Sequence, residues 1–442
     1  MVEHAVTRIA AAAASANARA PRIFIPPACP ARAADSSRTA RVPQNREVAE
    51  IAPLRALRFA DQAGPLGDLL CPPYDVISDA ERDRLYGLSP HNFVRVEYPK
   101  PDGDPYTAAA AELSTWRLRS VMKQDASPAL YVHDHEFLAG NTRVRRRGIH
   151  CALRLHAPEE GVIMPHELTF PKAKADRLAL LRATRTNTSA VFAMYADTRG
   201  EITGAISRRV EGMRPLAEAT VGYEVHRVWA IGDRLAMGEL REAFAKRRLY
   251  IADGHHRYET ALTYLGERDG SADAPQRFTL AYLCALDDAG LRILATHRIV
   301  RDGGDALDRA IDRSFERAEI DAGTLGDMQP GIVIVRDGHY TQLRLRAEAD
   351  LSALPSAWRD LPVAQAEELL LRGARDVGAE ITYEHDTNAA ITAAESGATA
   401  VLLRAVDPQT LQRVADSGER LPQKTTYFHP KVPAGLIVRA LD

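Results

Sequence analysis

The stretch RLYIADGHHRYETAL, residues 248–262, decides how the rest of the chain is interpreted. An apolar run of strand length stops at Asp253 and Gly254, and apolar residues recur at helical spacing from Arg257 onward. The segment therefore predicts a strand that passes directly into a helix. The first turn of a helix carries N–H groups without intrahelical partners and the positive end of the helix dipole. We expect this corner to bind an anion such as a phosphate.

The polar side chains at the corner fit that chemistry. His255, His256 and Arg257 add hydrogen-bond donors. Gly254 lets the backbone approach a ligand closely, and Asp253 offers a hard oxygen to a divalent cation or a substrate hydroxyl. The alternative is a structural corner, in which the aspartate caps the helix, the glycine forms a turn and the histidines face solvent. Five such residues in succession after an apolar strand favour a functional anion or metal site.

Composition restricts the class of protein. A chain of 442 residues with 45% hydrophobic residues is expected to form about two or three domains. The net charge of −2 provides no general basic field for nonspecific nucleic-acid binding. Four cysteines without paired spacing argue against a disulfide framework or a zinc knuckle, and a reducing cytoplasm fits them best. No apolar run approaches the roughly 20 residues of a membrane span.

The chain divides into a leader and three regions. Residues 1–45 are rich in alanine and arginine and are interrupted by prolines, so they have little with which to build a core. We interpret them as a disordered leader, although an organelle transit peptide has a similar composition. The regions that follow are an N-terminal α+β region (46–160), a central core (161–300) and a C-terminal α/β region (301–442) that closes the site.

Several local patterns predict secondary structure. Ser78 begins a capping box and predicts a helix, and residues 92–96 alternate like a strand. Two hairpins are expected, one turning at residues 140–141 and one at residues 337–338. The strands of the first hairpin carry histidines that invite a metal interpretation, but hydrogen-bonded or solvent-facing structural histidines are the favoured one; these are His133, His135, His150 and, just beyond, His156.

A second polar stretch surrounds Glu167. The predicted helix that follows it carries a basic cluster that includes Lys174, Arg177 and Arg182. These cations suit a polyphosphate, and the carboxylate suits a general base. Nearby cations should also lower the pKa of Glu167. The alternative is a solvated helix face after a loop.

A third polar stretch, residues 419–431, lies close to the end of the sequence. It has too many prolines and polar donors for a strand or helix. Its two lysines and two adjacent hydroxyls suit a phosphate or an amino-acid carboxylate, and we assign Lys424, Thr425 and Thr426 to substrate binding. A surface loop that closes onto a domain is the alternative. The dinucleotide fingerprint and the P-loop pattern are both absent, so a nucleotide must be held in another way.

These stretches together carry a family resemblance. Over nearly all of residues 48–442 the chain resembles a bacterial family catalogued as a domain of unknown function, number 1015. The matching motifs are PPYDVI (72–77), HE (166–167), KADRL (174–178), LRATR (181–185), ADGHHRY (252–258), THR (296–298) and PQKTTYF (422–428). A narrower resemblance, to the archaeal ADP-dependent free-serine kinases, is carried by Pro-His-Glu at 165–167, Asp-Gly-His-His-Arg at 253–257 and Pro-Gln-Lys-Thr-Thr at 422–426.

The resemblance implies a fold and a set of roles. The fold would be α/β (α+β), with a ParB/sulfiredoxin-like catalytic core in the central region and elaborated flanking domains. Glu167 would be the catalytic acid/base, and Asp253, His255, His256 and Arg257 would form the phosphate and metal site, with Thr425 and Thr426 near the substrate. Adding the residue-level reasoning, we assign catalysis to Glu167, Asp253 and His256, phosphate or nucleotide binding also to Gly254, Lys174, Arg177 and Arg182, and the metal to Asp253.

The function expected from this site is phosphoryl transfer. The leading hypothesis is a kinase of free serine, or of a similar small hydroxy amino acid, that uses ATP, ADP or pyrophosphate with Mg²⁺. A phosphoserine phosphatase would use the same residues with water as nucleophile. A hypothesis from another class is a ParB-like nucleotide-binding regulatory or DNA-binding protein, against which the near-neutral charge argues.

Overall fold

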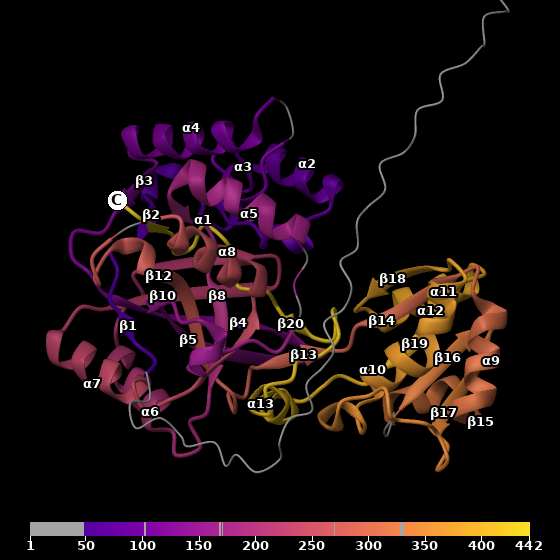
Figure 1. The fold of residues 1–442 in the computed structure, drawn as a ribbon. Coiled ribbons are helices and arrows are strands. Elements are labelled where there is room, and N and C mark those ends of the chain that lie inside the picture. The colour runs from indigo at the N-terminus through magenta and orange to yellow at the C-terminus, as the bar shows by residue number, and fades with distance from the viewer. Residues whose placement is uncertain (1–47, 101–102, 168, 170, 269, 328–330) are drawn as a thin grey trace, which may run out of the picture. The chain divides into compact units, whose positions relative to one another are not determined.

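Nine strands form one mixed sheet in the described part of the chain (Figure 1). The computed structural model describes residues 48–100, 103–167, 169, 171–268, 270–327 and 331–442. The strand order is β6-β11-β8-β12-β5-β4-β10-β9, with β1 also paired to β5. The strands are β1 (Ile51–Ala52), β4 (Leu130–Ala139), β5 (Thr142–Arg154), β6 (Ile163–Met164), β8 (Val191–Tyr195), β9 (Ala217–Val221), β10 (Glu224–Ile231), β11 (Leu249–Asp253) and β12 (Phe278–Ala285).

Parallel and antiparallel pairs both occur in this sheet. The β8–β12 and β6–β11 pairs are parallel, and the β4–β5 hairpin turns at residues 140–141 as predicted. Every residue of β12 is buried, because both faces of this strand are covered, and its sequence is accordingly a nearly continuous apolar run. The helices that pack on the sheet are α6 (Glu201–Val210), α7 (Arg234–Phe244) and α8 (His255–Gly266), and α5 (Pro171–Thr184) packs on α8.

Residues 57–124 form a small region beside the large sheet. Its core contains Phe59, Phe93 and Trp116, whose rings contact one another. Its elements are β2 (Leu57–Phe59), β3 (Met122–Gln124), α1 (Leu66–Leu69), α2 (Asp79–Leu88), α3 (Val94–Glu97) and α4 (Pro105–Leu118), and short 3-10 turns cover Asp61–Ala63 and Tyr74–Val76. A further 3-10 turn, Pro158–Glu160, lies between β5 and β6 of the large sheet.

Two local predictions in this region have different outcomes. The predicted helix start is confirmed, since α2 begins after Ser78, whose hydroxyl accepts a hydrogen bond from the Glu81 N–H at 3.2 Å. The strand predicted at residues 92–96 is wrong, because α3 lies there. The buried Asn92 side chain accepts from the Val94 N–H and donates to two backbone carbonyls, so it favours a turn over an extended strand.

A second sheet of six strands is entirely antiparallel, in the order β15-β17-β16-β19-β14-β18 among the residues described. Its β16–β17 hairpin turns at residues 337–338, as predicted. The strands are β14 (His297–Arg301), β15 (Phe315–Ile320), β16 (Ile332–Arg336), β17 (His339–Leu345), β18 (Glu380–Glu384) and β19 (Thr399–Leu403). The associated helices are α9 (Gly304–Ser314), α10 (Pro362–Gln365), the π-helix Ala366–Leu371, α11 (Arg372–Asp376), α12 (Thr387–Glu395) and α13 (Pro408–Asp416), and 3-10 turns cover Ala322–Asp327 and Ser356–Trp358. The 3-10 turn Pro275–Arg277 precedes β12 of the large sheet.

The last described residues return to earlier segments and complete the site. Strand β20 (Tyr427–His429) pairs with β13 (Arg292–Leu294), and β21 (Arg439–Ala440) pairs with β7 (Thr186–Asn187). An isolated parallel bridge joins Glu167 to Leu421. Three segments that are distant in sequence therefore meet at the end of β11.

The fold is mixed α/β, as predicted. The large sheet takes strands from both of the predicted regions 46–160 and 161–300, and the predicted leader, residues 1–45, lies outside the described residues. Among the described helices, none has the length and apolar character of a membrane-spanning segment.

Candidate active site

The predicted strand-to-helix corner is present. Strand β11 ends at Asp253 and α8 begins at His255, so Gly254 alone makes the turn. Gly254 has φ +86° and ψ 29°, a left-handed conformation that favours glycine. A Cβ at this position would lie 3.0 Å from the Arg257 guanidinium. Glycine is therefore required both by the backbone conformation and by the close approach of this arginine.

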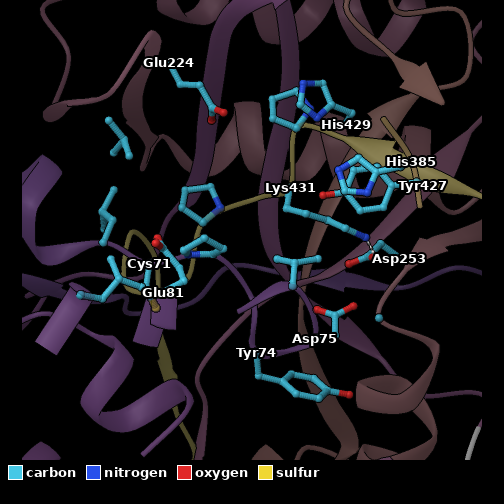
Figure 2. A pocket seen from close by; sticks show the side chains of 18 of the residues that line it. Cys71, Tyr74, Asp75, Glu81, Glu224, Asp253, His385, Tyr427, His429 and Lys431 are labelled. Atoms are coloured by element: carbon cyan, nitrogen blue, oxygen red, sulfur yellow. Dashed lines mark hydrogen bonds and ion pairs between the residues drawn. The ribbon is translucent and has the colours of Figure 1, made fainter. Parts of the chain in front are cut away.

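Asp253 is held by two cations. One carboxylate oxygen accepts from Arg257 Nη2 at 2.6 Å, and the other pairs with Lys431 Nζ (Figure 2). Burial opposes ionisation, but Lys431 and Arg257 outweigh it and hold the pKa of Asp253 below its ordinary value. Arg257 Nη1 also donates to the Ala190 carbonyl. The carboxylate is therefore ionised, with both oxygens engaged, and the guanidinium is fixed in place.

Two buried histidines connect the corner to the other segments. The His166 N–H donates to His255 Nε2 at 3.3 Å. His166 Nδ1 lies 2.6 Å from the Ile251 carbonyl, so this nitrogen carries the proton, and its Nε2 accepts from the Thr426 hydroxyl at 3.2 Å. Burial lowers the pKa of His166 to about 4 and also lowers that of His255. Both imidazoles are therefore neutral and act through hydrogen bonds rather than charge.

Glu167 is half-buried at the same cavity. Its Oε1 accepts from the Lys424 backbone N–H at 2.7 Å, and the Leu421 N–H donates to the His166 carbonyl at 2.7 Å. Burial raises the pKa of Glu167 to about 7, although Lys424 and Lys431 act in the opposite direction. The expectation that nearby cations would lower this pKa is wrong, because desolvation dominates.

The cations of α5 do not line the cavity. Lys174 Nζ pairs with Glu259 at 3.0 Å, and Arg182 Nε donates to Glu267 at 3.0 Å. Arg177 is buried, donates to the Glu97 carbonyl at 2.7 Å and lies 4.0 Å over the Tyr74 ring. It therefore anchors the loop that contains Tyr74. The structure does not bring these three predicted phosphate ligands to the corner.

The loop at residues 422–426 is positioned by its backbone. Lys424 has φ 56°, a left-handed conformation, which lets its N–H reach Glu167. The buried Thr425 hydroxyl donates to the Pro422 carbonyl at 2.6 Å and does not line the cavity. Lys424 and Thr426 do line it. Of the predicted substrate-binding residues, Thr425 thus holds the loop and the other two face the space.

The cavity has a volume of about 910 Å³, within the range of small-molecule and cofactor sites. It contains all five residues of the corner, with Glu167 on its wall. Sequence reasoning missed part of the lining, namely His226 and six residues that Figure 2 labels: Asp75, Glu224, His385, Tyr427, His429 and Lys431. Asp75 belongs to the PPYDVI motif, and Lys431 belongs to the third polar stretch. These two memberships were the sequence signals that could have identified them as lining residues.

The fit of a divalent cation at Asp253 is poor in this arrangement. Both of its oxygens are engaged by Lys431 and Arg257, so a cation there would have to displace an ion pair and lie beside the released positive charge. The role of Asp253 as a metal ligand stays a prediction. In this structure Asp253 orients the two cations.

Comparisons with known proteins give the following matches. The family described as "Protein of unknown function (DUF1015)" matches residues 51–364. No curated protein matches the chain. A conserved hypothetical protein from Pyrococcus furiosus is 13% identical over 63% of this chain and 92% of its own, with a TM-score of 0.35. A free serine kinase in complex with AMP is 14% identical over 60% of this chain and 83% of its own, with a TM-score of 0.34. SbnI with a C-terminal truncation, from Staphylococcus aureus, is 10% identical over 63% of this chain and 84% of its own, with a TM-score of 0.37.

Proposed function

This chain belongs to the DUF1015 family of proteins of unknown function, and we propose that it is a phosphotransferase that moves a phosphoryl group from a nucleotide or pyrophosphate to the hydroxyl of a small amino acid, with free serine as the first candidate. One observation carries the proposal. A carboxyl group whose pKa is about 7, Glu167, lies in the same cavity as the fixed cations Arg257 and Lys431. A base poised near neutral pH beside an anion site is the combination that phosphoryl transfer to a hydroxyl needs.

Glu167 is the proposed general base. One of its oxygens is held by the Lys424 N–H, and among the described residues the carboxylate makes no other hydrogen bond. The second oxygen can therefore accept the proton of an acceptor hydroxyl. A base works best when its pKa is close to the working pH, since it is then both ionised and sufficiently basic.

The corner is the proposed site of the transferring phosphoryl group. It lies at the N-terminal end of α8, where the helix dipole is positive, and it carries the charges of Arg257 and Lys431. Lys424 adds a third cation on the opposite loop. Because Asp253 already fixes Arg257 and Lys431, these cations do not reorganise during the reaction, and preorganised charge of this kind stabilises the transition state.

The acceptor is proposed to lie between Glu167 and the 422–426 loop. Thr426 faces this space, and its hydroxyl donates to the neutral His166, which leaves the hydroxyl oxygen available to accept from a substrate ammonium or hydroxyl. Lys424 can pair with the carboxylate of an amino acid. An amino acid that carries a hydroxyl satisfies all three groups. The resemblance of the Pro-His-Glu and Asp-Gly-His-His-Arg motifs to those of free-serine kinases supports the same assignment.

A phosphoryl-transfer screen tests the proposal. The purified chain is incubated with Mg²⁺, with serine, threonine or homoserine as acceptor and with ATP, ADP or pyrophosphate as donor, and the products are read by phosphorus NMR. We expect a phosphomonoester of one acceptor to form. A parallel mixture contains phosphoserine, and its hydrolysis without transfer in any other mixture would show a phosphatase instead. Tight, strongly salt-dependent DNA binding in the absence of both reactions would show a nucleic-acid-binding protein.

A further inference from the structure

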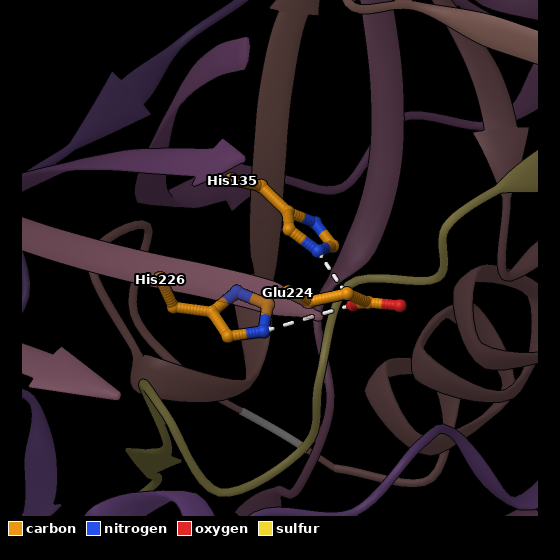
Figure 3. A group of neighbouring side chains, drawn as sticks. All are labelled: His135, Glu224 and His226. Atoms are coloured by element: carbon orange, nitrogen blue, oxygen red, sulfur yellow. Dashed lines mark hydrogen bonds and ion pairs between the residues drawn. The ribbon is translucent and has the colours of Figure 1, made fainter. Parts of the chain in front are cut away.

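Two places at the cavity wall could hold the divalent cation that accompanies a polyphosphate. One is Asp75, which is near the corner. The other is the cluster of His135, Glu224 and His226, whose ligand atoms all lie within 4.8 Å of one another (Figure 3). The two differ in hydrogen bonding, and this difference decides between them.

The histidine cluster is already satisfied internally. His135 Nδ1 lies 3.1 Å from Arg146 Nη2, and a guanidinium can only donate, so the His135 proton must be on Nε2. That proton is donated to Glu224 at 2.7 Å. His135 therefore cannot coordinate an ion without losing its contact with Arg146.

Charge and ligand type also count against this cluster. The fully buried Arg146 brings a positive charge beside it. Without His135, only the carboxylate of Glu224 and one nitrogen of His226 are left. A nitrogen donor suits zinc or copper better than Mg²⁺, and zinc sites generally use three or four protein ligands.

Asp75 has the opposite properties. It is exposed and lines the cavity, and among the described residues its carboxylate has no hydrogen bond or ion pair. In Figure 2 the carboxylate is directed toward Asp253 and Lys431. Its charge favours the protonated forms of His256, Arg257 and Lys431, so it faces the proposed phosphate position.

The loop that presents Asp75 is rigidly held. The neighbouring Tyr74 N–H donates to Glu97 at 3.3 Å, and its ring packs beneath the Arg177 guanidinium. Glu97 is in turn held by the Ser189 hydroxyl at 2.8 Å. A carboxylate on such a support is preorganised, and its exposure leaves room for the waters that Mg²⁺ retains.

We propose that Asp75, and neither Asp253 nor the histidine cluster, is the carboxylate that holds the divalent cation of the phosphoryl donor. Mg²⁺ typically binds to one or two carboxylates and to the phosphates of the substrate, with water completing the shell. Asp75 supplies one carboxylate oxygen, and the polyphosphate at the corner supplies the others. The inference rests on the proposed function, because it assumes a polyphosphate at this corner.

The test measures binding rather than turnover. Calorimetry on the full chain measures the affinity for ADP in the presence of Mg²⁺ and again in the presence of EDTA. Pyrophosphate is measured in the same two conditions. We expect Mg²⁺ to tighten the binding of both probes to the wild type. In the presence of Mg²⁺, Asp75→Asn should lower the affinity for these probes about 10- to 100-fold. The same variant should bind the metal-free probes at least as well as the wild type, since it removes a negative charge.

Two control variants complete the design. Asp61→Asn makes the same change at an exposed position outside the cavity, and Glu224→Gln removes the carboxylate of the histidine cluster. Both should keep the full effect of Mg²⁺. The inference would be overturned if Mg²⁺ tightened binding to Asp75→Asn as much as to the wild type. It would also be overturned if Glu224→Gln lost the effect of Mg²⁺, or if Mg²⁺ did not tighten binding to the wild type. Asp75-dependent Mg²⁺ binding without phosphoryl transfer to any acceptor would instead overturn the proposed function alone.

Discussion

Glu167 is the residue whose environment most directly predicts an activity profile. Burial favours the neutral carboxyl and raises its pKa to about 7. A base must be ionised to accept a proton, so kcat/KM should be half-maximal near pH 7, fall about tenfold per unit below it and level off above it. The measurement is a pH–rate profile of the transfer reaction. A profile that stays flat down to pH 5 would place the base elsewhere.

Substitution tests the same residue directly. Glu167→Gln keeps the shape and one acceptor but cannot take a proton, so kcat should fall by about 10² to 10⁴. Nucleotide binding measured by calorimetry should be unchanged, because the phosphate contacts are assigned to the corner. Glu159→Gln, at an exposed position outside the cavity, is the matched control and should retain full activity. Near-normal turnover in the Glu167 variant would make Asp253 or His166 the next candidates.

Lys431 is the residue that sequence reasoning left without a specific role. Its ammonium pairs with Asp253 and lies 4.8 Å from the Tyr427 ring. Lys431→Met keeps the length of the side chain but removes the charge, so pyrophosphate or nucleotide binding should weaken by about 1.5–3 kcal/mol. The measurement is calorimetry on the folded variant. Lys172→Met, at an exposed site on α5 outside the cavity, should bind as the wild type does; equal losses in both variants would indicate only a general effect of net charge.

At the scale of the element, the turn between β11 and α8 depends on Gly254. Gly254→Ala places a Cβ in a left-handed conformation and 3.0 Å from the Arg257 guanidinium. We expect a loss of about 1–2 kcal/mol in the free energy of unfolding, together with weaker phosphate binding as Arg257 is displaced. Both quantities are measurable, by denaturation and by calorimetry.

A second glycine provides the matched control. Gly200 precedes α6 with φ 65°, and a Cβ there would meet nothing within 4 Å. Gly200→Ala should therefore lose a similar free energy of unfolding but keep normal phosphate binding. If Gly254→Ala also keeps normal binding, the position of Arg257 is not critical for the ligand.

At the scale of the whole molecule, Arg298 connects the second sheet to the site. It is fully buried, donates to Glu367 at 2.8 Å and lies 3.5 Å from the Gln423 carbonyl in the loop beside Glu167. Arg298→Met leaves Glu367 with fewer partners in a buried position. The free energy of unfolding should fall by roughly 3–5 kcal/mol, as measured by urea denaturation.

An exposed ion pair serves as the control for this prediction. Arg413 and Asp360 lie 3.3 Å apart, with side chains 56% and 63% exposed. Arg413→Met should change the free energy of unfolding by less than about 1 kcal/mol, because solvent screens such pairs. Equal stability of the two variants would show that the buried pair contributes no more than a surface pair.

The local structure of this chain is largely determined by its sequence. The corner at Gly254, the helix start at Ser78 and both hairpins follow from periodicity and turn chemistry, which act over a few residues. The same reasoning failed at residues 92–96, where the buried hydrogen bonds of Asn92 override an alternating pattern. Local patterns are reliable where no distant partner competes with them.

The sequence by itself pointed to three segments that line the candidate site, since Glu167, the 253–257 corner and the 422–426 loop each stood out by residue type and spacing. Only the tertiary structure decided how those residues act. Asp253 is ion-paired with Lys431, 178 residues away, and Glu167 is held by Lys424, 257 residues away. The pKa of Glu167 near 7 and the engagement of both Asp253 oxygens follow from burial and long-range charge, which depend on the assembled fold and not on neighbours in the chain.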